Sequence, residues 1–279
     1  MSDTFFSRLF RRAFAKKLPP TGKMEAYGAL GEEMIYRKLR ESFDCVIRNV
    51  IIPQGEGYLE KDFLVIQDGV SLVVEVKCWK GTITTSPSGD RFFQEKADGT
   101  RKELNSPVRS TTRFLAAMKS FYRLKELPLG VVVFADPDCD LDVPPISDGI
   151  VLVTGAQMIS TIRNLIKGAT APAEPLDPAR VLCCTRLYSR DGRSFCKGMV
   201  TDAEIPCYTE DGQPVAIHPL YLRFISVDHQ PLRQRDKLTV TFVNDTSAIF
   251  YNYTSMLTLH CLDGTVLRVA LSRLDTVVF

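Results

Sequence analysis

Paired cysteines at regular spacing are absent from this sequence of 279 residues. Its eight cysteines include no CxxC pair, and zinc sites and disulfide frameworks both depend on such spacings. No secretory-type signal is recognisable, so we expect reduced thiols in a cytoplasmic protein. The cysteines and histidines that come nearest to a zinc-binding group match no zinc spacing and are expected to be buried thiols and isolated imidazoles: Cys183, Cys184, Cys196, Cys207, His218 and His229.

Long apolar runs, a catalytic histidine context and a large net charge are also missing. The sequence has no run of about eighteen apolar residues, so we expect no membrane-spanning helix. None of the three histidines has a serine or cysteine beside it in a nucleophile-type context, which gives no support to a Ser-His-Asp hydrolase. The net charge is only +2, so a nucleic-acid site has to be a local patch.

The most informative segment runs from Glu60 to Gly81 and has the pattern of two strands joined by a tight turn. Asp68-Gly69 between two alternating apolar runs is a strong signal for a two-residue hairpin. Such a loop places Gln67 opposite Val70 and thereby fixes the register of the whole pair.

That register places Asp62 directly opposite Glu75, and Glu60 opposite Lys77. Strand alternation then puts Asp62, Glu75 and Lys77 on one face. Facing carboxylates about 5 Å apart repel each other, and the apolar run Leu72–Val76 adds a desolvation cost. A bound divalent cation would turn this repulsion into coordination. The alternative is a solvated strand face that carries these three residues without a function.

Asp62 followed by Glu75-x-Lys77 resembles the catalytic core of the restriction-endonuclease-like PD-(D/E)xK nucleases. More narrowly, the segment resembles the NERD family, the nuclease-related domain. The residues that carry the resemblance are Gly28-x-x-Gly31-Glu32 on a predicted helix, then Glu60-Lys61-Asp62, then the run from Glu75 to Ile83. It extends from about Tyr27 to Phe121.

The resemblance implies a metal-dependent nuclease that hydrolyses phosphodiester bonds, with DNA as the expected substrate. It implies that Asp62, Glu75 and the backbone carbonyl of Val76 bind Mg²⁺ or Mn²⁺. Lys77 would orient the attacking water or stabilise the charge that develops on the phosphate. Glu32 would complete the site or hold a second ion, and its neighbour Glu33 is the alternative for that role.

One position departs from the family pattern. Where the family has Asn-Pro followed three residues later by Gln, this sequence has Ser106-Pro107 and then Ser110. An amide that could bind a site carboxylate is therefore missing. This departure favours the alternative that the fold is a non-catalytic module that binds nucleic acid or a protein partner. Chemistry on RNA or a small nucleotide is a third possibility.

Four basic residues and the only tryptophan are the candidates for nucleic-acid contacts. Arg101 and Lys102 precede a predicted helix over 107–126, and Arg109 and Arg113 lie off its apolar stripe. They could contact phosphates or form a solvated face. Trp79 could stack on a base or pack on the hairpin, and packing is the favoured prediction.

The other elements of this part predict an α/β fold, and the resemblance implies a restriction-endonuclease-like mixed sheet flanked by helices. Further helices are expected at 24–41 and 156–167, and strands at 45–52, 130–135 and 150–153. Short strands at 82–85, 91–94 and 101–104 are expected to extend the sheet. The acidic run that begins at Asp136 loosely has the spacing of a calcium loop, but lacks its glycine and terminal glutamate, and we expect no calcium there.

The segments outside this fold differ in composition. Residues 1–20 predict a basic amphipathic helix, and residues 1–18 could contact an anionic membrane surface or a protein partner, or pack on the core. The nuclease-like domain is expected at 21–168, a Pro/Ala-rich linker at 169–179 and a small all-β domain, barrel or sandwich, at 180–279. Its expected strands are 181–188, 195–200, 215–217, 238–243, 248–253, 256–261, 267–271 and 276–279. The oligomeric state and the role of this domain are left open.

Overall fold

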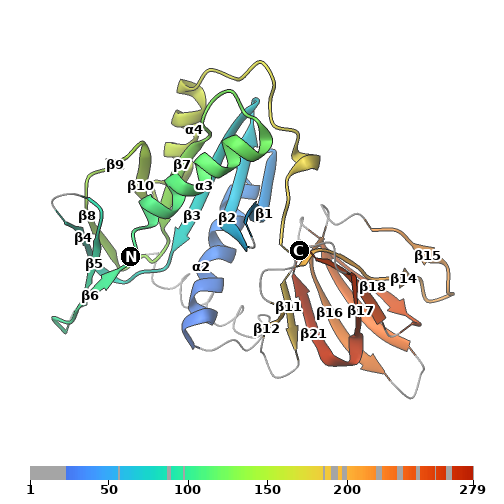
Figure 1. Cartoon of the computed structure of the whole chain (residues 1–279). Coiled ribbons are helices and arrows are strands. Elements are labelled where there is room, and N and C mark those ends of the chain that lie inside the picture. Colours follow the sequence, from blue (N-terminus) through green and yellow to red (C-terminus); the bar gives the residue numbers. More distant parts are fainter. Residues whose placement is uncertain are drawn as a thin grey trace. The chain divides into compact units, whose positions relative to one another are not determined.

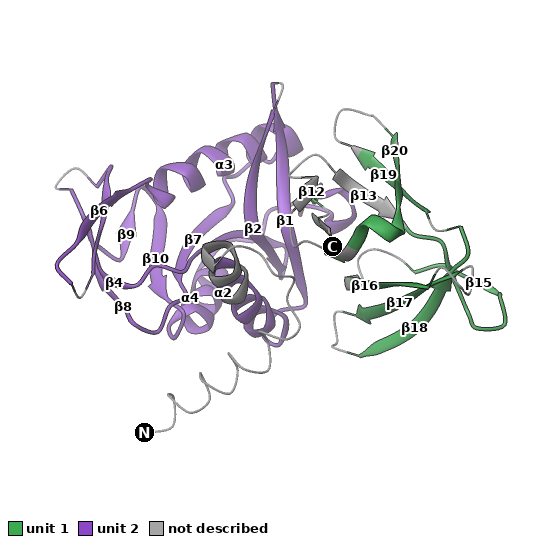
Figure 2. Ribbon diagram, turned by 90° about the horizontal axis from the view of Figure 1, so that it is seen from below, with its two compact units in different colours: residues 1–26, 183–279 green, residues 27–182 purple. Residues whose placement is uncertain are grey.

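The computed structural model contains two compact units (Figure 1, Figure 2). Residues 27–182, purple in Figure 2, are called the first unit below, and the unit that comprises residues 1–26 and 183–279, green in Figure 2, is called the second. The structure describes residues 23–55, 57–86, 89–96, 98–184, 186–189, 194–196, 200–217, 222–230, 235–242, 246–254, 256–261 and 266–278. The amphipathic helix predicted over residues 1–20 lies outside these residues. No helix among those described is long and apolar enough to cross a membrane.

A mixed sheet forms the centre of the first unit, as predicted. Its described strands lie in the order β1 (Cys45–Gln54), β2 (Gly57–Gln67), β3 (Val70–Lys77), β7 (Leu129–Phe134), β10 (Ile150–Thr154) and β9 (Ile146–Ser147). β3 pairs with β7 and β7 with β10 in parallel, while the remaining neighbours are antiparallel. The apolar runs of β3 and β7 reflect this central position, because a strand with helices on both faces is buried on both.

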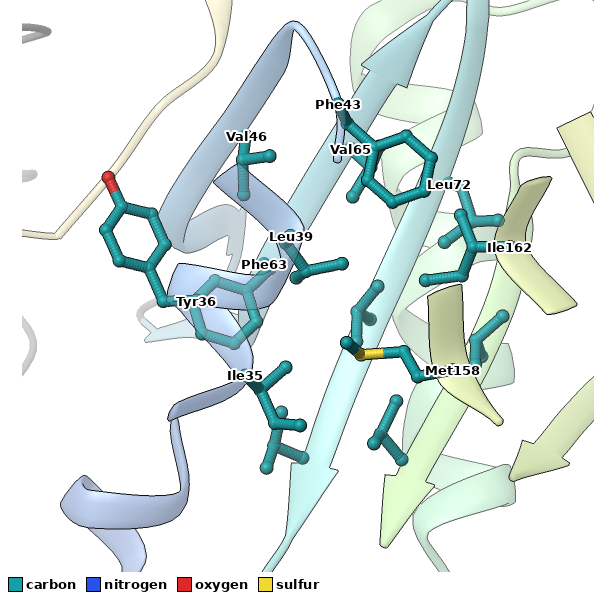
Figure 3. Packing of buried hydrophobic residues seen from close by; sticks show 14 of the residues in the cluster. Ile35, Tyr36, Leu39, Phe43, Val46, Phe63, Val65, Leu72, Met158 and Ile162 are labelled. Carbon is teal, nitrogen blue, oxygen red and sulfur yellow. The ribbon is translucent and has the colours of Figure 1, made fainter. Parts of the chain in front are cut away.

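Helices cover both faces of this sheet (Figure 1). Helix α2 (Lys23–Arg40) and helix α4 (Met158–Gly168) supply Ile35, Leu39 and Ile162 to a core on one face, together with alternate residues of β2 and β3 such as Val65 and Leu72 (Figure 3). Helix α3 (Pro107–Tyr122) packs on the other face, where its buried residues contact β7. This arrangement confirms the α/β sandwich with a sheet between helices.

The ends of α3 show why it is shorter than predicted. Ser106 caps its N-terminus, where the hydroxyl oxygen accepts a hydrogen bond from the backbone N–H of Arg109 at 3.2 Å, and Pro107 occupies the first turn. Arg123 adopts the left-handed conformation with φ of 56°, which ends the helix at Tyr122. The prediction that it continues to Glu126 is therefore wrong.

The short strands after Gly81 form a separate four-stranded sheet in the order β6 (Arg101–Leu104), β5 (Phe92–Glu95), β4 (Gly81–Thr85) and β8 (Cys139–Asp142). They were expected as an extension of the central sheet. β8 pairs in parallel with β4, so part of the acidic run is a strand. Asp138 forms an ion pair with Lys80 at 3.1 Å.

The segment predicted as a linker packs on the first unit. Leu176 is buried, and Ala171 and Pro175 lie beside Gly69. Further along, the carbonyl oxygen of Leu182 accepts a hydrogen bond from the backbone N–H of Ile51. These contacts explain why the first unit ends at Leu182.

In the second unit the described strands form two open antiparallel sheets. Of the two folds predicted for this domain, the sandwich is therefore confirmed and the barrel is wrong. The order is β12, β11, β21, β16, β17, β18, β14 and β15 in one sheet and β13, β19 and β20 in the other. Their bounds are Ser194–Cys196, Arg186–Ser189, Leu274–Val278, Leu222–Gln230, Arg235–Phe242, Ser247–Asn252, Cys207–Tyr208 and Pro214–Val215, then Val200–Glu204, Met256–Cys261 and Val266–Ala270. Both sheets contribute to one buried cluster, which includes Leu238, Val240, Leu257 and Leu259.

Strand β16 was missed in the sequence. Its register against β17 shifts between Leu222 and Phe224, and such an irregularity interrupts the alternation of apolar and polar residues on which strand prediction depends. Regular alternation of apolar and polar residues is left only from Ile225 to Val227, because the strand ends in the polar residues Asp228, His229 and Gln230. Three residues are too few to indicate a strand.

A glycine allows α2 to approach the end of β3 closely. A Cβ atom on Gly31 would lie 1.9 Å from the Sγ atom of Cys78, whereas a Cβ atom on Gly28 would meet nothing within 4 Å. Cys78 directly follows β3, so this contact sets the distance between α2 and the strand that carries Glu75 and Lys77.

We expect Gly31→Ala to lower the free energy of unfolding by ~1–3 kcal/mol, the usual cost of overpacking. Gly28→Ala is the matched control on the same helix and should be neutral or stabilising by up to about 1 kcal/mol. Urea unfolding measures both. In a Cys78→Ala background the penalty of Gly31→Ala should largely disappear, because the clashing sulfur atom is gone; an equal penalty in both backgrounds would contradict the packing argument.

Candidate active site

The hairpin forms in the predicted register. Gln67 faces Val70, and the turn residues Asp68 and Gly69 have φ angles of 52° and 78°. Positive φ at both central residues is the geometry of the type I′ turn that Asp-Gly favours.

Backbone pairing of β2 is interrupted at Asp62 on both sides. Towards β3 the last paired residues are Phe63 and Val74, so Asp62 and Glu75 do not pair through their backbones. Towards β1 the register leaves out Asp62 and the residue opposite it, Asn49, which has a φ of 49°. The sheet is therefore locally open around Asp62.

The side chain of Asp62 fills the opening. Its Oδ2 atom accepts a hydrogen bond from the backbone N–H of Val76 at 2.6 Å, in place of a ladder bond between the strands. The N–H and C=O groups of one residue in an extended strand point to the same side. The carbonyl group of Val76 is therefore expected to face the same opening as the carboxylate of Asp62.

Glu75 lies between two lysines. Its Oε1 atom is 2.5 Å from the Nζ atom of Lys77, and its Oε2 atom is 2.8 Å from the Nζ atom of Lys61. The carboxylate is 7% exposed, so both contacts are strong, charge-assisted hydrogen bonds in a largely water-free place.

Lys61 connects this carboxylate to α3. It is only 4% exposed, and its ammonium group also contacts the hydroxyl oxygen of Ser110 at 3.0 Å. The hydroxyl of Ser110 donates in turn to the carbonyl oxygen of Pro107 at 3.0 Å. A buried ammonium group is tolerated only when it is paired in this way.

Burial and neighbouring charge strongly affect Asp62. Its pKa is raised well above the ordinary value, first by burial and then by the negative charges of Glu75 and Glu32, while Lys77 and the Val76 N–H act in the opposite direction. The carboxyl group is thus poised to gain a positive partner, either a proton or a cation.

The same charges separate the two candidate glutamates on α2. Glu32 raises the pKa of Asp62 and also that of the Cys78 thiol, which burial and these acidic neighbours bring to about 12. Glu33 instead binds Arg37 and Arg48 at 3.2 and 3.1 Å and is buried in this structural network. Glu32 is therefore the α2 carboxylate whose charge acts on Asp62.

Lys77 and Glu75 stabilise each other's charged forms. Burial alone would raise the pKa of Glu75, but Lys77 and Lys61 outweigh it and lower that pKa. Burial alone would lower the pKa of Lys77, but Glu75 and Asp62 outweigh it and raise that pKa. In the cation-free protein Lys77 is therefore an ammonium donor rather than a base at neutral pH.

The donor chemistry of this opening fits a hard divalent cation. Mg²⁺ in such sites is held by one or two carboxylates together with water and phosphate oxygens. Asp62, Glu75 and the Val76 carbonyl supply only oxygen. In the described part of the chain, no group of three or more His, Cys, Asp or Glu side chains is arranged to enclose a metal ion.

Four of the five predicted nucleic-acid contacts lie on two elements. Arg101 and Lys102 are exposed on β6, where the guanidinium of Arg101 lies 4.2 Å from the centre of the Phe93 ring. Arg109 and Arg113 are exposed one turn apart on α3, either side of Ser110, and Arg113 donates to the Gln54 side chain.

Trp79 packs within the first unit, as favoured from the sequence. Its ring lies edge-on to Phe134 and Phe92, with centroid distances of 5.7 and 6.3 Å. These contacts hold the segment that follows β3 against β7 and β5 and give base stacking no support.

Sequence reasoning did not identify Lys61 as a site residue. It named Ser110 only as the position where this chain departs from the family pattern. One signal was present: Lys61 is a charged residue in a strand whose following residues, Phe63 to Ile66, are all apolar and buried. A lysine in such a pattern needs a buried acceptor. The acceptor on α3 is 49 residues away, which no local pattern reveals.

Replacing Asp62 with asparagine should stabilise the cation-free protein at neutral and higher pH. A raised folded-state pKa means that protonated Asp62 contributes stability below its ordinary pKa, which is lost as pH rises through the folded pKa. Asparagine keeps the acceptor for Val76 without the charge. Thermal unfolding in chelator between about pH 4 and pH 9 should show a gain that is smallest in acid and reaches ~1 kcal/mol or more above neutrality. Asp148→Asn, at an exposed turn, should give no such pH-dependent gain; a flat difference for Asp62→Asn would contradict the assigned charge state.

Comparison with known proteins agrees with this geometry. Residues 27–135 match the family model of the nuclease-related domain, NERD, which covers α2, the hairpin, α3 and β7. No curated protein and no solved structure gives a match to this chain. The part of the chain from residue 27 to residue 135 is a nuclease-related domain of the NERD family.

Proposed function

We propose that this protein is a metal-dependent nuclease that hydrolyses phosphodiester bonds in DNA. The observation that carries the proposal is the convergence of Asp62, Glu75 and Lys77 at the opening between β2 and β3, within the residues that match the nuclease-related domain. These are the carboxylates and the lysine that the chemistry requires, and they interact although they come from two strands.

Asp62, Glu75 and the carbonyl of Val76 would hold Mg²⁺ or Mn²⁺. The ion, when bound, would polarise the phosphate and lower the pKa of the attacking water. Asp62 would be ionised in that state, because a cation beside it reverses the effect of Glu75 and Glu32 on its pKa.

Lys77 would stabilise the negative charge that develops on the phosphate, rather than accept a proton from water. Its raised pKa keeps it protonated, and it is the more exposed of the two lysines on Glu75, at 28% against 5% for the side chain of Lys61. An ammonium group near the surface of the opening can move to a substrate oxygen. Glu32 would complete the negative site or bind a second ion.

The substrate backbone would contact α3. Arg109 and Arg113 are exposed one turn apart and flank Ser110, which is joined to Glu75 through Lys61. A phosphate chain that reaches the opening would pass these two guanidinium groups. Arg101 and Lys102 on β6 are a second basic pair for the same role.

The alternative is a module that has kept the fold without catalysis. Two observations favour it: ammonium groups occupy both oxygens of Glu75, and Ser110 stands at the position of the family's amide. Calorimetry separates the two functions, since a non-catalytic module should bind no Mn²⁺ through its carboxylates.

Substitutions at the opening should abolish cleavage. We expect Asp62→Asn, Glu75→Gln and Lys77→Met each to reduce the rate of cleavage of supercoiled and linear DNA in Mg²⁺ by at least about a hundredfold. Lys125→Met, on an exposed side chain near the far end of α3, is the control and should retain the full rate. Wild-type rates in the Asp62 and Lys77 variants would refute the nuclease assignment.

The salt dependence of binding should identify the phosphate contacts. In chelator, where cleavage cannot proceed, Arg109→Gln and Arg113→Gln should each reduce the slope of log K against log salt by about 1. Arg163→Gln, on the exposed face of α4, should leave the slope unchanged, because α3 and α4 cover opposite faces of the sheet. Equal slopes for all three variants would remove α3 from the interface. The same measurement on Arg101→Gln and Lys102→Gln determines whether β6 also contacts the DNA backbone.

A further inference from the structure

Lys61 is the charged group of the site that no assigned role explains. It is 4% exposed and ends within hydrogen-bond distance of only two described acceptors, Glu75 Oε2 and Ser110 Oγ. An apolar residue would avoid the desolvation of an ammonium group at this position. Its presence therefore calls for a contribution to the site itself.

The two lysines on Glu75 are held in different ways. Lys61 is nearly inaccessible and has a second acceptor in Ser110, whose own hydroxyl proton is directed to the carbonyl of Pro107. Lys77 is more than a quarter exposed, and Glu75 is its ion-pair partner in the described structure. When a cation approaches Glu75, Lys77 can turn to solvent or substrate, whereas Lys61 has no comparable way out.

We propose that Lys61, seated by Ser110, is a positioning residue that fixes the Oε2 atom of Glu75 and leaves only Oε1 for the cation. This inference rests on the proposed function and specifies how the site is built. Ser110 stands where the family pattern has an amide, and here its oxygen accepts a hydrogen bond from the Lys61 ammonium group that also contacts Glu75 Oε2.

This arrangement also sets the affinity for the ion. Glu75 is paired with both Lys61 and Lys77, and the charge of Lys77 also acts on Asp62 and on Glu32. If Lys77 moves away and Lys61 stays, one positive charge remains fixed on the other oxygen of the Glu75 carboxylate and repels the ion. Removal of that charge strengthens the attraction and frees Glu75 to bind the ion through both oxygens.

The first test is calorimetric titration of the full chain with Mn²⁺ alone. Lys61→Met keeps the length of the side chain without its charge, and should bind Mn²⁺ on the order of tenfold more tightly than wild type. Ser110→Ala should shift the affinity in the same direction by a smaller factor, because Lys61 loses its second acceptor. Lys125→Met is the control for loss of one lysine charge elsewhere, and thermal unfolding establishes that each variant is folded.

The second test restores the amide. If Lys61 fixes Glu75, Lys61→Met should cleave DNA more slowly although it binds the ion more tightly, because Glu75 is then free to bind in the wrong geometry. The double variant Lys61→Met/Ser110→Gln supplies a donor to Oε2 and should recover at least about half of the lost rate. Its Mn²⁺ affinity should fall only part of the way back to the wild-type value, because glutamine supplies a donor to Oε2 but not the charge of Lys61.

The results separate this inference from the nuclease proposal. Tighter Mn²⁺ binding by Lys61→Met that Ser110→Gln partly reverses supports the positioning role, even if neither the wild type nor any variant cleaves DNA. In that case only the nuclease proposal fails. Unchanged or weaker binding by a folded Lys61→Met protein, or absence of binding in both proteins, overturns the positioning role. If Ser110→Gln does not lower the Mn²⁺ affinity of the Lys61→Met protein, the positioning role is also overturned.

Discussion

The carboxyl group of Asp62, at one end of β2 and β3, is affected by the negative charges of Glu75 and Glu32 in addition to burial, and this repulsion has to be balanced by the groups around it. Lys61 and Lys77 balance Glu75, but neither forms an ion pair with Asp62. The negative charge of the site is thus partly compensated by the chain and partly left for a proton or a cation. Every chemical property proposed for the site follows from this imbalance.

The balance depends on an interrupted sheet. If the ladder between β2 and β3 continued past Phe63, the N–H of Val76 would bond a backbone carbonyl and the Asp62 side chain would point to one face. Instead the ladder stops, and the Asp62 carboxylate takes this N–H at 2.6 Å. Asn49 on the other neighbouring strand is unpaired at the same level. The close approach of α2 at Gly31 then brings Glu32 to the opening. A backbone defect thereby becomes the place where side chains of three elements meet.

Much of this could be predicted from local sequence. The Asp-Gly turn fixed the register that brings Asp62 to Glu75, and the apolar runs of β3 and β7 indicated central strands. The interruption of the ladder at Asp62 could not be predicted, because alternation describes regular strands only. Lys61 escaped notice because its partner Ser110 is distant in sequence. β16 was missed for a related reason, since its irregular register breaks the period of two.

The energetics of the opening bear on the choice between an enzyme and a binding module. A fold kept only as a platform would gain stability from neutral side chains at Asp62 and Lys61, because buried charges cost more in desolvation than their pairs return. Platform binding through α3 or β6 would not need them. A cation and a phosphate bound at the opening would lower this desolvation cost, because each charged side chain then has a partner that folding alone does not supply. The cost carried by Asp62 and Lys61 in the isolated chain is therefore better explained by chemistry at this site than by the stability of the fold.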